Sequence, residues 1–357
     1  MKTALFTGAG ASRAIGYPLT SELLPRVRSE LKSESLFSGM NSDAKNKRDR
    51  KELYTYLLQL LPGFEDVVDQ DLPLITEVFS LVEYALFAGE ALAIGGEGTL
   101  LRCRDLLKQA ITDILLGDFI EPWDSSDENQ QRERKMLNLL TRWIEHQGET
   151  LGLITTNYDI GIEYELYGKM KQKDFYNILD LGFDWRDTES GDEHTRPSKP
   201  IFRIFKLHGS LDLLKCQSCG YVYFNPDGTI AHQSFRESID AGNTCHCRRD
   251  IRLQLHIVSP SLVREIRDAN LLSVWRSALE WMRTADQWII AGYSLPPEDL
   301  AVRSLLLRAY TTAARKPKVT VVQRGIDEMS RYKLFFPDCD YVSDGLEGFL
   351  DRPNSSI

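Results

Sequence analysis

The sequence predicts an α/β protein with a doubly wound parallel sheet, because short apolar runs alternate with helical patterns. The runs hold four to seven residues and are bounded by Gly, Asn, Asp or Pro. Such runs are typical of strands that are buried on both faces of a sheet. The predicted strands are 3–7, 151–155, 201–207, 255–258, 288–291 and 319–322. Two helices are predicted between the last strands, at 262–284 and 298–315.

A large helical insertion is predicted between the first two strands, because apolar residues recur there at helical spacing. A third helix of this region opens on a capping-box pattern, Ser125-x-x-Glu128. The charged stretch 41–52 has no periodicity and is predicted to be a solvated loop. Residues 20–147 therefore form a predicted helical module. The periodic positions are Ile75, Val78, Phe79, Val82, Leu86; Leu100, Cys103, Leu107, Ala110, Ile114; and Met136, Leu139, Leu140, Trp143.

Charge and length exclude several classes of protein. The 357 residues include 43 Lys and Arg against 52 Asp and Glu, a net charge of −9. Direct binding to nucleic acid or to a membrane surface favours a basic face, so neither is expected. The apolar stretch at the N-terminus has about four residues, against about 7–15 in a signal peptide. No uncharged apolar run of membrane-spanning length occurs either, so we expect a cytoplasmic protein.

A glycine-rich turn follows the first predicted strand and reads Gly8-Ala9-Gly10-Ala11-Ser12. Glycines allow the backbone N–H groups to approach a pyrophosphate closely, which favours a nucleotide site over a plain tight turn. The strict dinucleotide pattern fails, because Arg13 stands where its third glycine belongs. A hydrolase nucleophile elbow is weaker still, since it would need glycine at Ala14.

Polar residues follow other predicted strands at their carboxyl ends. Asn157 and Asp159 come after 151–155, and His208 comes after 201–207. In open α/β sheets ligands bind outside the carboxyl ends of the strands, so these side chains and the glycine turn are expected to face one crevice. Each has a simpler interpretation: a helix cap or Asx-turn for Asn157 and Asp159, and a core histidine for His208. Gly292 and Ser294, after the strand 288–291, are either phosphate donors or a plain turn.

Four of the six cysteines form two close pairs, Cys216-x-x-Cys219 and Cys245-x-Cys247. Four thiolates suit tetrahedral zinc, and a segment of about 37 residues with few large apolar side chains needs such a staple. A redox Cys-x-x-Cys is the alternative, but it leaves the second pair without a role. A closed four-thiolate site makes the zinc structural. His246 is a less favoured candidate ligand, and Cys103 and Cys339 are expected to be buried.

The ordered set of motifs resembles the sirtuin family. Gly-Ala-Gly-x-Ser is followed by Thr-x-Asn-x-Asp, Leu-His-Gly, two cysteine pairs and Gly-x-Ser-Leu, over residues 5–295. The resemblance implies a Rossmann-like NAD-binding domain with a small zinc module and a helical module. The corresponding ranges are 1–19 and 148–357 for the first, 214–250 for the zinc module within it, and 20–147 for the helical insertion.

By this resemblance, each motif has a role toward NAD+. Gly8, Ala9, Gly10 and Ser12 would hold the pyrophosphate and the adjoining ribose. Asn157 would position the nicotinamide ribose and the attacking water, Asp159 the carboxamide, and His208 would be the general base. Gly292 and Ser294 would contact the phosphates or the adenosine ribose, with Gln323 near the adenine. Structural zinc would be bound by Cys216, Cys219, Cys245 and Cys247.

Two departures shift the implied activity away from the sirtuin deacylases. Their Gly-Ile-Pro-Asp-Phe-Arg segment is replaced by residues 16–21, Gly-Tyr-Pro-Leu-Thr-Ser, and their peptide-binding Phe-Gly-Glu by residues 257–262. The chain is most similar to bacterial sirtuin-like proteins that hydrolyse NAD+ to nicotinamide and ADP-ribose in anti-phage defence. Such proteins imply a homo-oligomer and a partner ATPase or Argonaute-type protein. An NAD-dependent deacylase and a non-catalytic NAD or ADP-ribose sensor are the alternatives.

Overall fold

A computed structural model describes residues 1–120, 127–170, 172–188, 190–226, 230–237, 243–261, 268–297 and 299–352. Its centre is a seven-stranded sheet in the order β14-β13-β12-β1-β2-β6-β3. All six neighbouring pairs of this sheet are parallel. The strands are β1 (Thr3–Thr7), β2 (Leu151–Thr155), β3 (Leu179–Asp180), β6 (Phe202–Lys206), β12 (Gln287–Ala291), β13 (Lys318–Val322) and β14 (Asp340–Val342).

The sheet confirms the predicted α/β class and five of the six predicted strands. β1, β2 and β12 are buried along nearly their whole length, as continuous apolar runs require. The chain runs from β1 to β2 and β6 on one side, and later to β12 on the other. The strand order therefore reverses at β1, and this reversal is the place where doubly wound sheets bind ligands.

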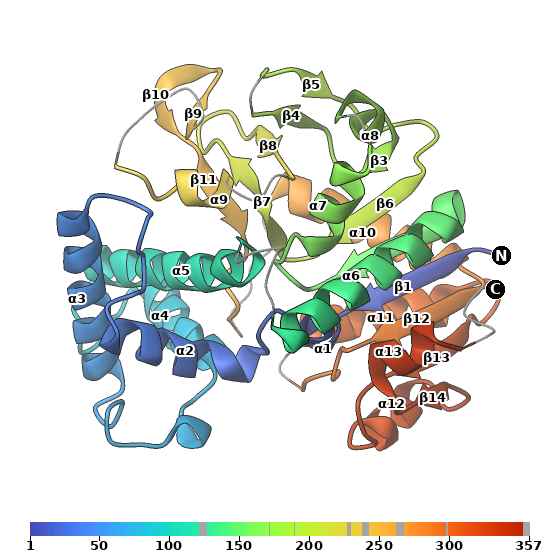
Figure 1. The fold of residues 1–357 in the computed structure, drawn as a ribbon, viewed down its shortest axis with the longest axis horizontal. Coiled ribbons are helices and arrows are strands. Elements are labelled where there is room, and N and C mark those ends of the chain that lie inside the picture. Colours follow the sequence, from blue (N-terminus) through green and yellow to red (C-terminus); the bar gives the residue numbers. More distant parts are fainter. Residues whose placement is uncertain are drawn as a thin grey trace.

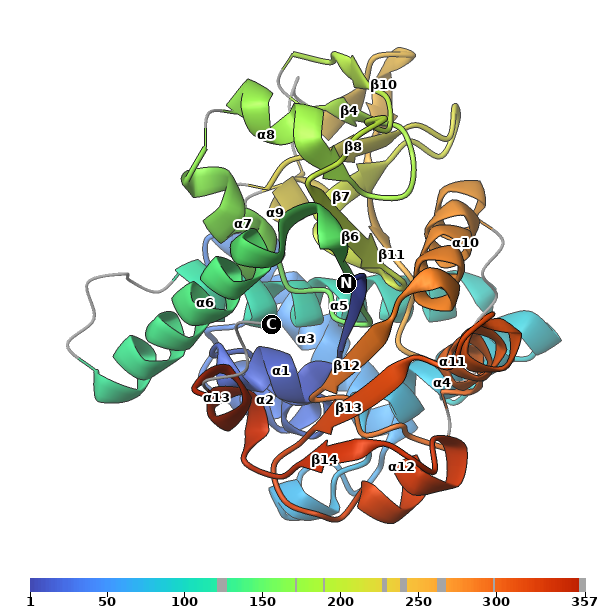
Figure 2. The ribbon, with the colours of Figure 1, turned by 90° about the vertical axis from the view of Figure 1, so that its right-hand side faces the viewer.

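Helices cover both faces of the sheet (Figure 2). On one face lie α1 (Ala9–Ala14), α6 (Glu128–Gln147) and α13 (Gly345–Leu350). On the other lie α10 (Ala269–Thr284) and α11 (Leu300–Thr312), which were predicted at 262–284 and 298–315. Residues 262–267 and 298 lie outside the described ranges. The helices α7 (Gly161–Gly168), α8 (Gln172–Ile178) and α12 (Met329–Phe335) also follow β2 in the sequence. Two short 3-10 helices also occur, η1 (Asp69–Asp71) and η2 (Gly148–Thr150).

The segment between β1 and β2 is helical, and α2 to α5 gather at one end of the molecule (Figure 1). They are α2 (Thr20–Lys32), α3 (Asp43–Leu60), α4 (Ile75–Ala88) and α5 (Glu97–Ile120). Their buried residues belong to the same continuous apolar core as those of the sheet. The last helix, α6, packs instead on the sheet, where Trp143 meets Phe349 with ring centroids 6.2 Å apart. The division at 20–147 stays a prediction.

The predicted loop at 41–52 is wrong, because these residues begin helix α3. Ser42 caps it by accepting a hydrogen bond from the Lys45 amide at 3.4 Å. Asp49 occupies the inward face, and its buried carboxylate lies 2.7 Å from Lys45 Nζ and 2.6 Å from Arg102 Nη2. A face that is closed by ion pairs needs few apolar residues, so no hydrophobic period marks this helix.

The predicted capping box at Ser125 and Glu128 also needs correction. Ser125 lies outside the described residues, and Glu128 is the first residue of α6 rather than the third. The N-cap is Asp127, whose carboxylate accepts hydrogen bonds from the amides of Asn129 at 2.8 Å and Gln130 at 3.1 Å. A capping aspartate satisfies two amides of the first turn, which a Ser-x-x-Glu pattern two residues earlier would not reach.

A second sheet, mainly antiparallel, lies beside the first in the order β11-β7-β8-β4-β5. The strand predicted at 255–258 exists as β11, but it was assigned to the wrong sheet. It pairs antiparallel with β7 instead of joining the parallel sheet. A four-residue apolar run does not specify its neighbour. The strands are β4 (Trp185–Asp187), β5 (Glu193–His194), β7 (Gly209–Lys215), β8 (Val222–Phe224) and β11 (Gln254–Ile257); β9 (Thr244–Cys245) pairs with β10 (Arg248–Arg252), and α9 (Ile230–Gln233) lies nearby.

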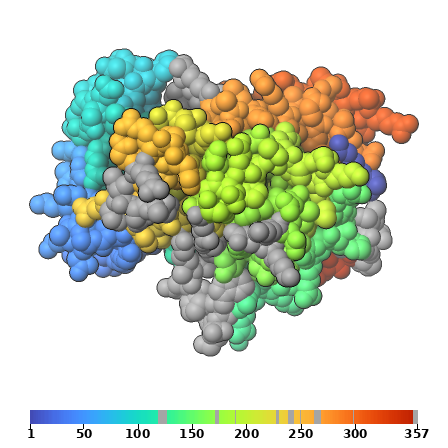
Figure 3. Space-filling view, turned by 90° about the horizontal axis from the view of Figure 1, so that it is seen from above, coloured from blue at the N-terminus to red at the C-terminus, as the bar shows by residue number. Residues whose placement is uncertain are grey.

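Helix α9 contacts α5, and Figure 3 shows the gold segment of this region beside the cyan helices. The Asn41 side chain donates to the Phe235 carbonyl at 3.0 Å and accepts from the Glu237 amide at 2.7 Å. No helix among the described residues has the length and apolarity needed to cross a membrane.

Candidate functional site

The carboxyl ends of the central strands are level with one another. Thr7 pairs with Thr155 and with Ala291, Thr155 pairs with Lys206, and Ala291 pairs with Val322. The next residues of these strands therefore lie along one edge of the sheet. This edge brings together the segments predicted to form the site, which are the glycine turn, Asn157 with Asp159, His208, Gly292 with Ser294, and Gln323.

The glycine turn and the loop after β12 pack directly on each other. The Gly10 amide donates to the Gly292 carbonyl at 2.8 Å, and the Gly8 amide donates to the Ala291 carbonyl at 3.1 Å. A Cβ atom at Gly8 would lie 2.8 Å from the Gly292 carbonyl oxygen, and one at Gly292 would lie 2.0 Å from the Ala11 nitrogen. The close approach of two backbones thus requires glycine at these positions, before any ligand is considered.

A chain of hydrogen bonds joins the turn to the residues after β2. The Asn157 side-chain amide donates to the Gly8 carbonyl at 2.9 Å and to Ser12 Oγ at 2.6 Å. Ser12 Oγ donates in turn to the Asp159 carboxylate at 2.5 Å. Ser12 and Asp159 are buried and Asn157 is half-buried. The Asn157 side chain is therefore oriented by two acceptors from the turn after β1, one of which is itself fixed by Asp159. Its carbonyl oxygen is the group it can offer to a ligand.

His208 contacts the backbone of Thr156, the residue that precedes Asn157. Its Nδ1 is 3.2 Å from the Thr156 carbonyl oxygen, and only 4% of the residue is exposed. A carbonyl oxygen can only accept, so Nδ1 carries the proton and Nε2 is the basic nitrogen of the neutral ring. Val258, which follows β11, is hydrogen-bonded to both His208 and Tyr158. Its amide donates to the His208 carbonyl and its carbonyl accepts from the Tyr158 hydroxyl, both at 2.8 Å.

The loop after β12 is held mainly through its backbone. The Gln323 side-chain amide and the Tyr332 hydroxyl both donate to the Tyr293 carbonyl. Arg331 donates to the Ser294 carbonyl at 2.7 Å, while the Ser294 residue itself is exposed. Gln323 is buried, so its amide nitrogen serves this loop rather than the surface.

A buried ion pair lies behind the site and was not predicted from the sequence. Lys206, the last residue of β6, points its ammonium at the Asp159 carbonyl oxygen and lies 2.9 Å from Glu163 Oε1 of α7. Burial acts to lower the pKa of Lys206, but the carboxylates of Glu163, Asp212 and Asp159 outweigh it and raise that pKa. Burial raises the pKa of Glu163 and of Asp212. One signal was available: Lys206 is a charged residue at the end of an apolar strand.

A small cavity separates this pair from the Asn157 side chain. Its volume is about 20 Å³, enough for about one water molecule. Ser12, Thr155, Asp159 and Lys206 supply polar groups to its wall. A nicotinamide ring does not fit there, so a ligand must meet Asn157 from its exposed side. A larger hollow of about 560 Å³ lies at the α1–α2 connection, between Arg13, Gly16 and residues 69–74.

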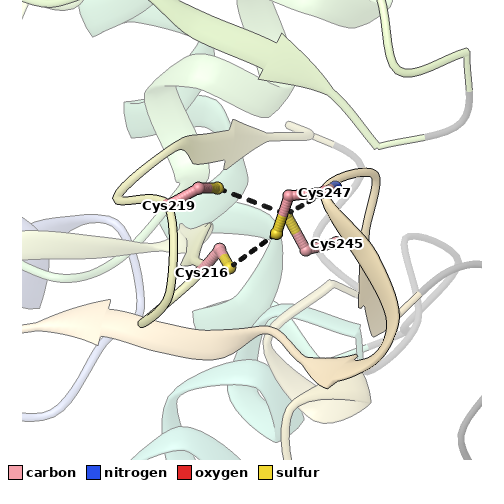
Figure 4. Close-up of side chains that lie close together, drawn as sticks. All are labelled: Cys216, Cys219, Cys245 and Cys247. Carbon is pink, nitrogen blue, oxygen red and sulfur yellow. Dashed lines mark hydrogen bonds between the residues drawn. The ribbon is translucent and has the colours of Figure 1, made fainter.

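The four predicted metal ligands lie together (Figure 4). The Sγ atoms of Cys216, Cys219, Cys245 and Cys247 all lie within 4.8 Å of one another, with Cys216 and Cys247 at 3.7 Å and Cys219 and Cys245 at 3.5 Å. Tetrahedral zinc with Zn–S bonds of about 2.3 Å places its sulfur atoms about 3.8 Å apart. The side chains therefore fit a zinc ion without rearrangement. Cys103 and Cys339 are buried elsewhere, as predicted.

Tyr223 supports this cluster and was not identified from the sequence. Its hydroxyl lies 3.2 Å from Cys245 Sγ and 3.2 Å from His246 Nδ1. Burial acts to raise the pKa of Cys245, but hydrogen bonds from Tyr223 and from the Cys247 amide lower it to about 7. A thiol that is deprotonated near neutral pH suits metal binding. The His246 ring stacks on Tyr223 and is not part of the cluster found among the described residues.

Fold and site together define a doubly wound α/β protein with a ligand site at the strand ends and a four-cysteine metal site. No family model and no curated protein matches the chain. Solved structures of Sir2 enzymes do match, including one on their mechanism and regulation, at 12% identity and a TM-score of 0.38 over 99% of this chain and 90% of that chain. A Sir2 complex with a p53 peptide and NAD+ matches at 13% and 0.41, over 98% and 90%.

A Sir2 homologue bound to 2′-O-acetyl ADP-ribose matches at 14% identity and a TM-score of 0.44, over 98% of this chain and 88% of that chain. These values are too low for any of the matches to carry an argument about this chain. The assignment that follows depends on the chain's own residues and their geometry.

Proposed function

We propose that this chain is an NAD+ glycohydrolase, which cleaves NAD+ to nicotinamide and ADP-ribose. The observation that carries the proposal is the placement of Asn157 and His208. Each lies two residues beyond the end of its strand, on neighbouring strands in register, and the Thr156 carbonyl joins them. An amide that donates to two fixed acceptors and a histidine ring are thus held at neighbouring strand ends, at the reversal of the sheet.

This pair suits the chemistry of a nicotinamide riboside bond. The bond breaks through an oxocarbenium-like state and its leaving group departs neutral, so no acid is required to protonate it. Asn157 holds the ribose and the attacking water in line, and this positioning is its contribution. His208 accepts the proton of that water through Nε2, because Nδ1 carries the ring proton that faces the Thr156 carbonyl.

The remaining predicted residues hold the dinucleotide in this proposal. Gly8, Ala9, Gly10 and Ser12 lie against the pyrophosphate and ribose, and Asp159 faces the carboxamide. Gly292 and Ser294 contribute backbone and hydroxyl donors to the phosphates. Gln323 acts on the adenine side indirectly, by fixing the Tyr293 carbonyl and with it this loop.

The biological setting in the proposal comes from the sirtuin resemblance alone. It comprises anti-phage defence, self-association and a partner ATPase or Argonaute-type protein. Such an enzyme needs a trigger that switches it on, because constant hydrolysis would deplete the cell of NAD+. The structural zinc ion, bound by the four cysteines, takes no part in the reaction.

The deciding experiment incubates the purified chain with NAD+, with and without an acetylated peptide, and follows nicotinamide and ADP-ribose. The proposal expects equal release in both arms. Release that requires the peptide would identify a deacylase instead, and NAD+ binding without release under every condition, including an oligomeric preparation, would identify a sensor.

Two variants test the assignment of residues. Asn157→Ala and His208→Ala are each expected to slow nicotinamide release by at least about 100-fold, the usual contribution of a positioned base or orienting group. Asn129→Ala is the matched control, because this asparagine is exposed on α6 and belongs to none of the segments assigned to the site. Unchanged turnover in either site variant would contradict the assigned role.

A further inference from the structure

The buried pair formed by Lys206 and Glu163 has no role in the mechanism above, yet it touches the segment that carries Asn157. Lys206 is 5% exposed and Glu163 is 2% exposed. Three different elements meet at this ammonium: it belongs to β6, its ion-pair partner lies in the first turn of α7, and the carbonyl it contacts belongs to Asp159 in the loop between β2 and α7.

Such a pair is an unusual choice for stability alone. Removing two charges from water costs several kcal/mol per ion, and well-packed apolar residues of similar volume are often as stable or more so. The surroundings are acidic, because Asp212 of β7 also faces Lys206. One cation among three buried carboxylates is therefore retained at a position where an apolar core would suffice, which points to a function in orienting the loop.

The contacts show what that function would be. The Asp159 carbonyl is tied to Lys206, while the Asp159 carboxylate accepts from Ser12, which accepts in turn from Asn157. Movement of the Asp159 backbone would therefore displace the Asp159 carboxylate, which orients the Ser12 hydroxyl. A displaced Ser12 hydroxyl would in turn change the orientation of the Asn157 amide. The Leu211 amide, which donates to the Tyr158 carbonyl at 3.0 Å, fixes the other side of the same loop.

We propose that Lys206, held by Glu163, is a positioning residue that clamps the loop 156–160 and thereby orients Asn157 through Asp159 and Ser12. This inference rests on the proposed function for its kinetic readout. The geometric part, the clamping of the loop, is independent of that function and is measured separately.

The main test is the double variant Lys206→Met/Glu163→Leu, which replaces the ion pair by apolar side chains of similar size. The loss of the Lys206 cation beside Asp212 is expected to lower stability, so kinetics are compared at a temperature where the variant is folded. A merely structural pair then predicts normal kinetics. The clamp predicts that kcat for nicotinamide release falls by about 100-fold, while KM for NAD+ stays within about threefold. A stable double variant with the kcat of the wild type would overturn the proposal.

A matched pair at one position guards against a double variant that fails to fold. Glu163→Gln keeps an oxygen that accepts a hydrogen bond from Lys206, whereas Glu163→Leu removes it. We expect kcat of Glu163→Gln to stay within about tenfold of the wild type. We expect kcat of Glu163→Leu to be at least about tenfold lower than that of Glu163→Gln. Equal kcat in the two variants would contradict the clamp.

Amide hydrogen exchange of peptides that cover residues 156–162 provides the readout that needs no activity. The clamp predicts exchange at least about tenfold faster in Glu163→Leu than in Glu163→Gln, with no change in peptides from β13. Absence of nicotinamide release from the wild type would refute the proposed function only. In that case faster exchange of the loop supports the clamp, and unchanged exchange overturns it.

Discussion

Gly292 is the residue at which the two halves of the site meet. Its φ of +62° lies in the left-handed region, and its α-carbon faces the Gly8–Ala11 backbone. From the sequence, this glycine is either a phosphate contact or part of a plain turn. The structure adds a third reason, which is that the loop after β12 and the turn after β1 are too close for any side chain.

We predict that Gly292→Ala destabilises the protein by about 2–5 kcal/mol, the sum of left-handed strain and a steric clash. Gly89→Ala is the matched control, because Gly89 has a φ of +68° but no atom lies within 4 Å of the place that a Cβ would occupy. The control should lose only about 1–2 kcal/mol. Urea unfolding of both variants measures the difference, and equal losses would show that the close approach is unimportant.

Asp113 on α5 is a buried carboxylate outside the site. Burial raises its pKa from 3.8 to about 6, although the Phe37 amide donates to it. His232, with Nε2 3.8 Å from the Asp113 carboxylate, has its pKa lowered to about 4 by burial and by Arg236. Between pH 4 and pH 6 both groups are therefore mainly neutral, and they do not form an ion pair.

The raised pKa of Asp113 predicts how the free energy of unfolding depends on pH. Because the folded state binds the Asp113 proton more tightly than the unfolded state, the contribution of this carboxyl group to stability falls as pH rises from about 4 to about 6, while the lowered pKa of His232 acts in the opposite direction. Asp113→Asn removes this loss and still accepts from Phe37. Its free energy of unfolding relative to the wild type should therefore rise between pH 4 and pH 7 by up to about 3 kcal/mol. A difference that is constant with pH would contradict the raised pKa.

At the scale of elements, the hairpin formed by β9 and β10 depends on the cysteine cluster. Cys245 of the hairpin belongs to a small apolar cluster that is separate from the main core and also includes Cys216 and Tyr223. A unit this small does not bury enough surface to be stable alone, so we expect metal binding to supply the missing free energy.

We therefore predict about one zinc ion per chain in the wild type, and loss of that ion in Cys219→Ser. Cys339→Ser is the control, since Cys339 lies in the main core. Metal analysis after dialysis measures the ion, and limited proteolysis should show new cleavage within 216–252 only in Cys219→Ser. Zinc retained by Cys219→Ser, or lost equally by both variants, would contradict the assignment.

The elements that were predicted correctly from the sequence share one property: their patterns are local. β1, β2, β12 and β13 are continuous apolar runs whose boundaries Gly or Asn residues mark. Helix α3 was missed because its inward Asp49 is satisfied by Arg102, which lies 53 residues away. β11 was assigned to the wrong sheet because its partner strand, β7, is distant in sequence, and a short apolar run does not indicate which strand it pairs with.

At the scale of the whole molecule, the α2–α5 helices and the sheet are built around one continuous core. The Asn41 contacts with Phe235 and Glu237 add a polar link from this helical region to the segment after α9. A shared core couples the two regions energetically, so we expect them to unfold together.

Leu107→Ala tests this coupling, because Leu107 is fully buried in α5. We expect a loss of about 2–5 kcal/mol, against less than about 0.5 kcal/mol for Leu81→Ala on the exposed side of α4. Four of the six tryptophans, at 185, 275, 281 and 288, lie outside residues 20–147, so the fluorescence reports mainly on the sheet region. The fluorescence and circular-dichroism midpoints should shift equally. An early loss of helix with unchanged fluorescence would instead support an independent module at 20–147.

The sequence by itself determined the class of the fold, the edge of the sheet that carries the site, and the four cysteines. Apolar runs identify parallel strands, parallel strands share one carboxyl edge, and cysteine spacing is local. Only the tertiary structure decided which side chains orient one another: the Gly292 contact with Ala11, the Ser12 link between Asn157 and Asp159, and the Lys206 pair with Glu163. The partners in these contacts lie between 43 and 281 positions apart, so no local pattern could reveal them.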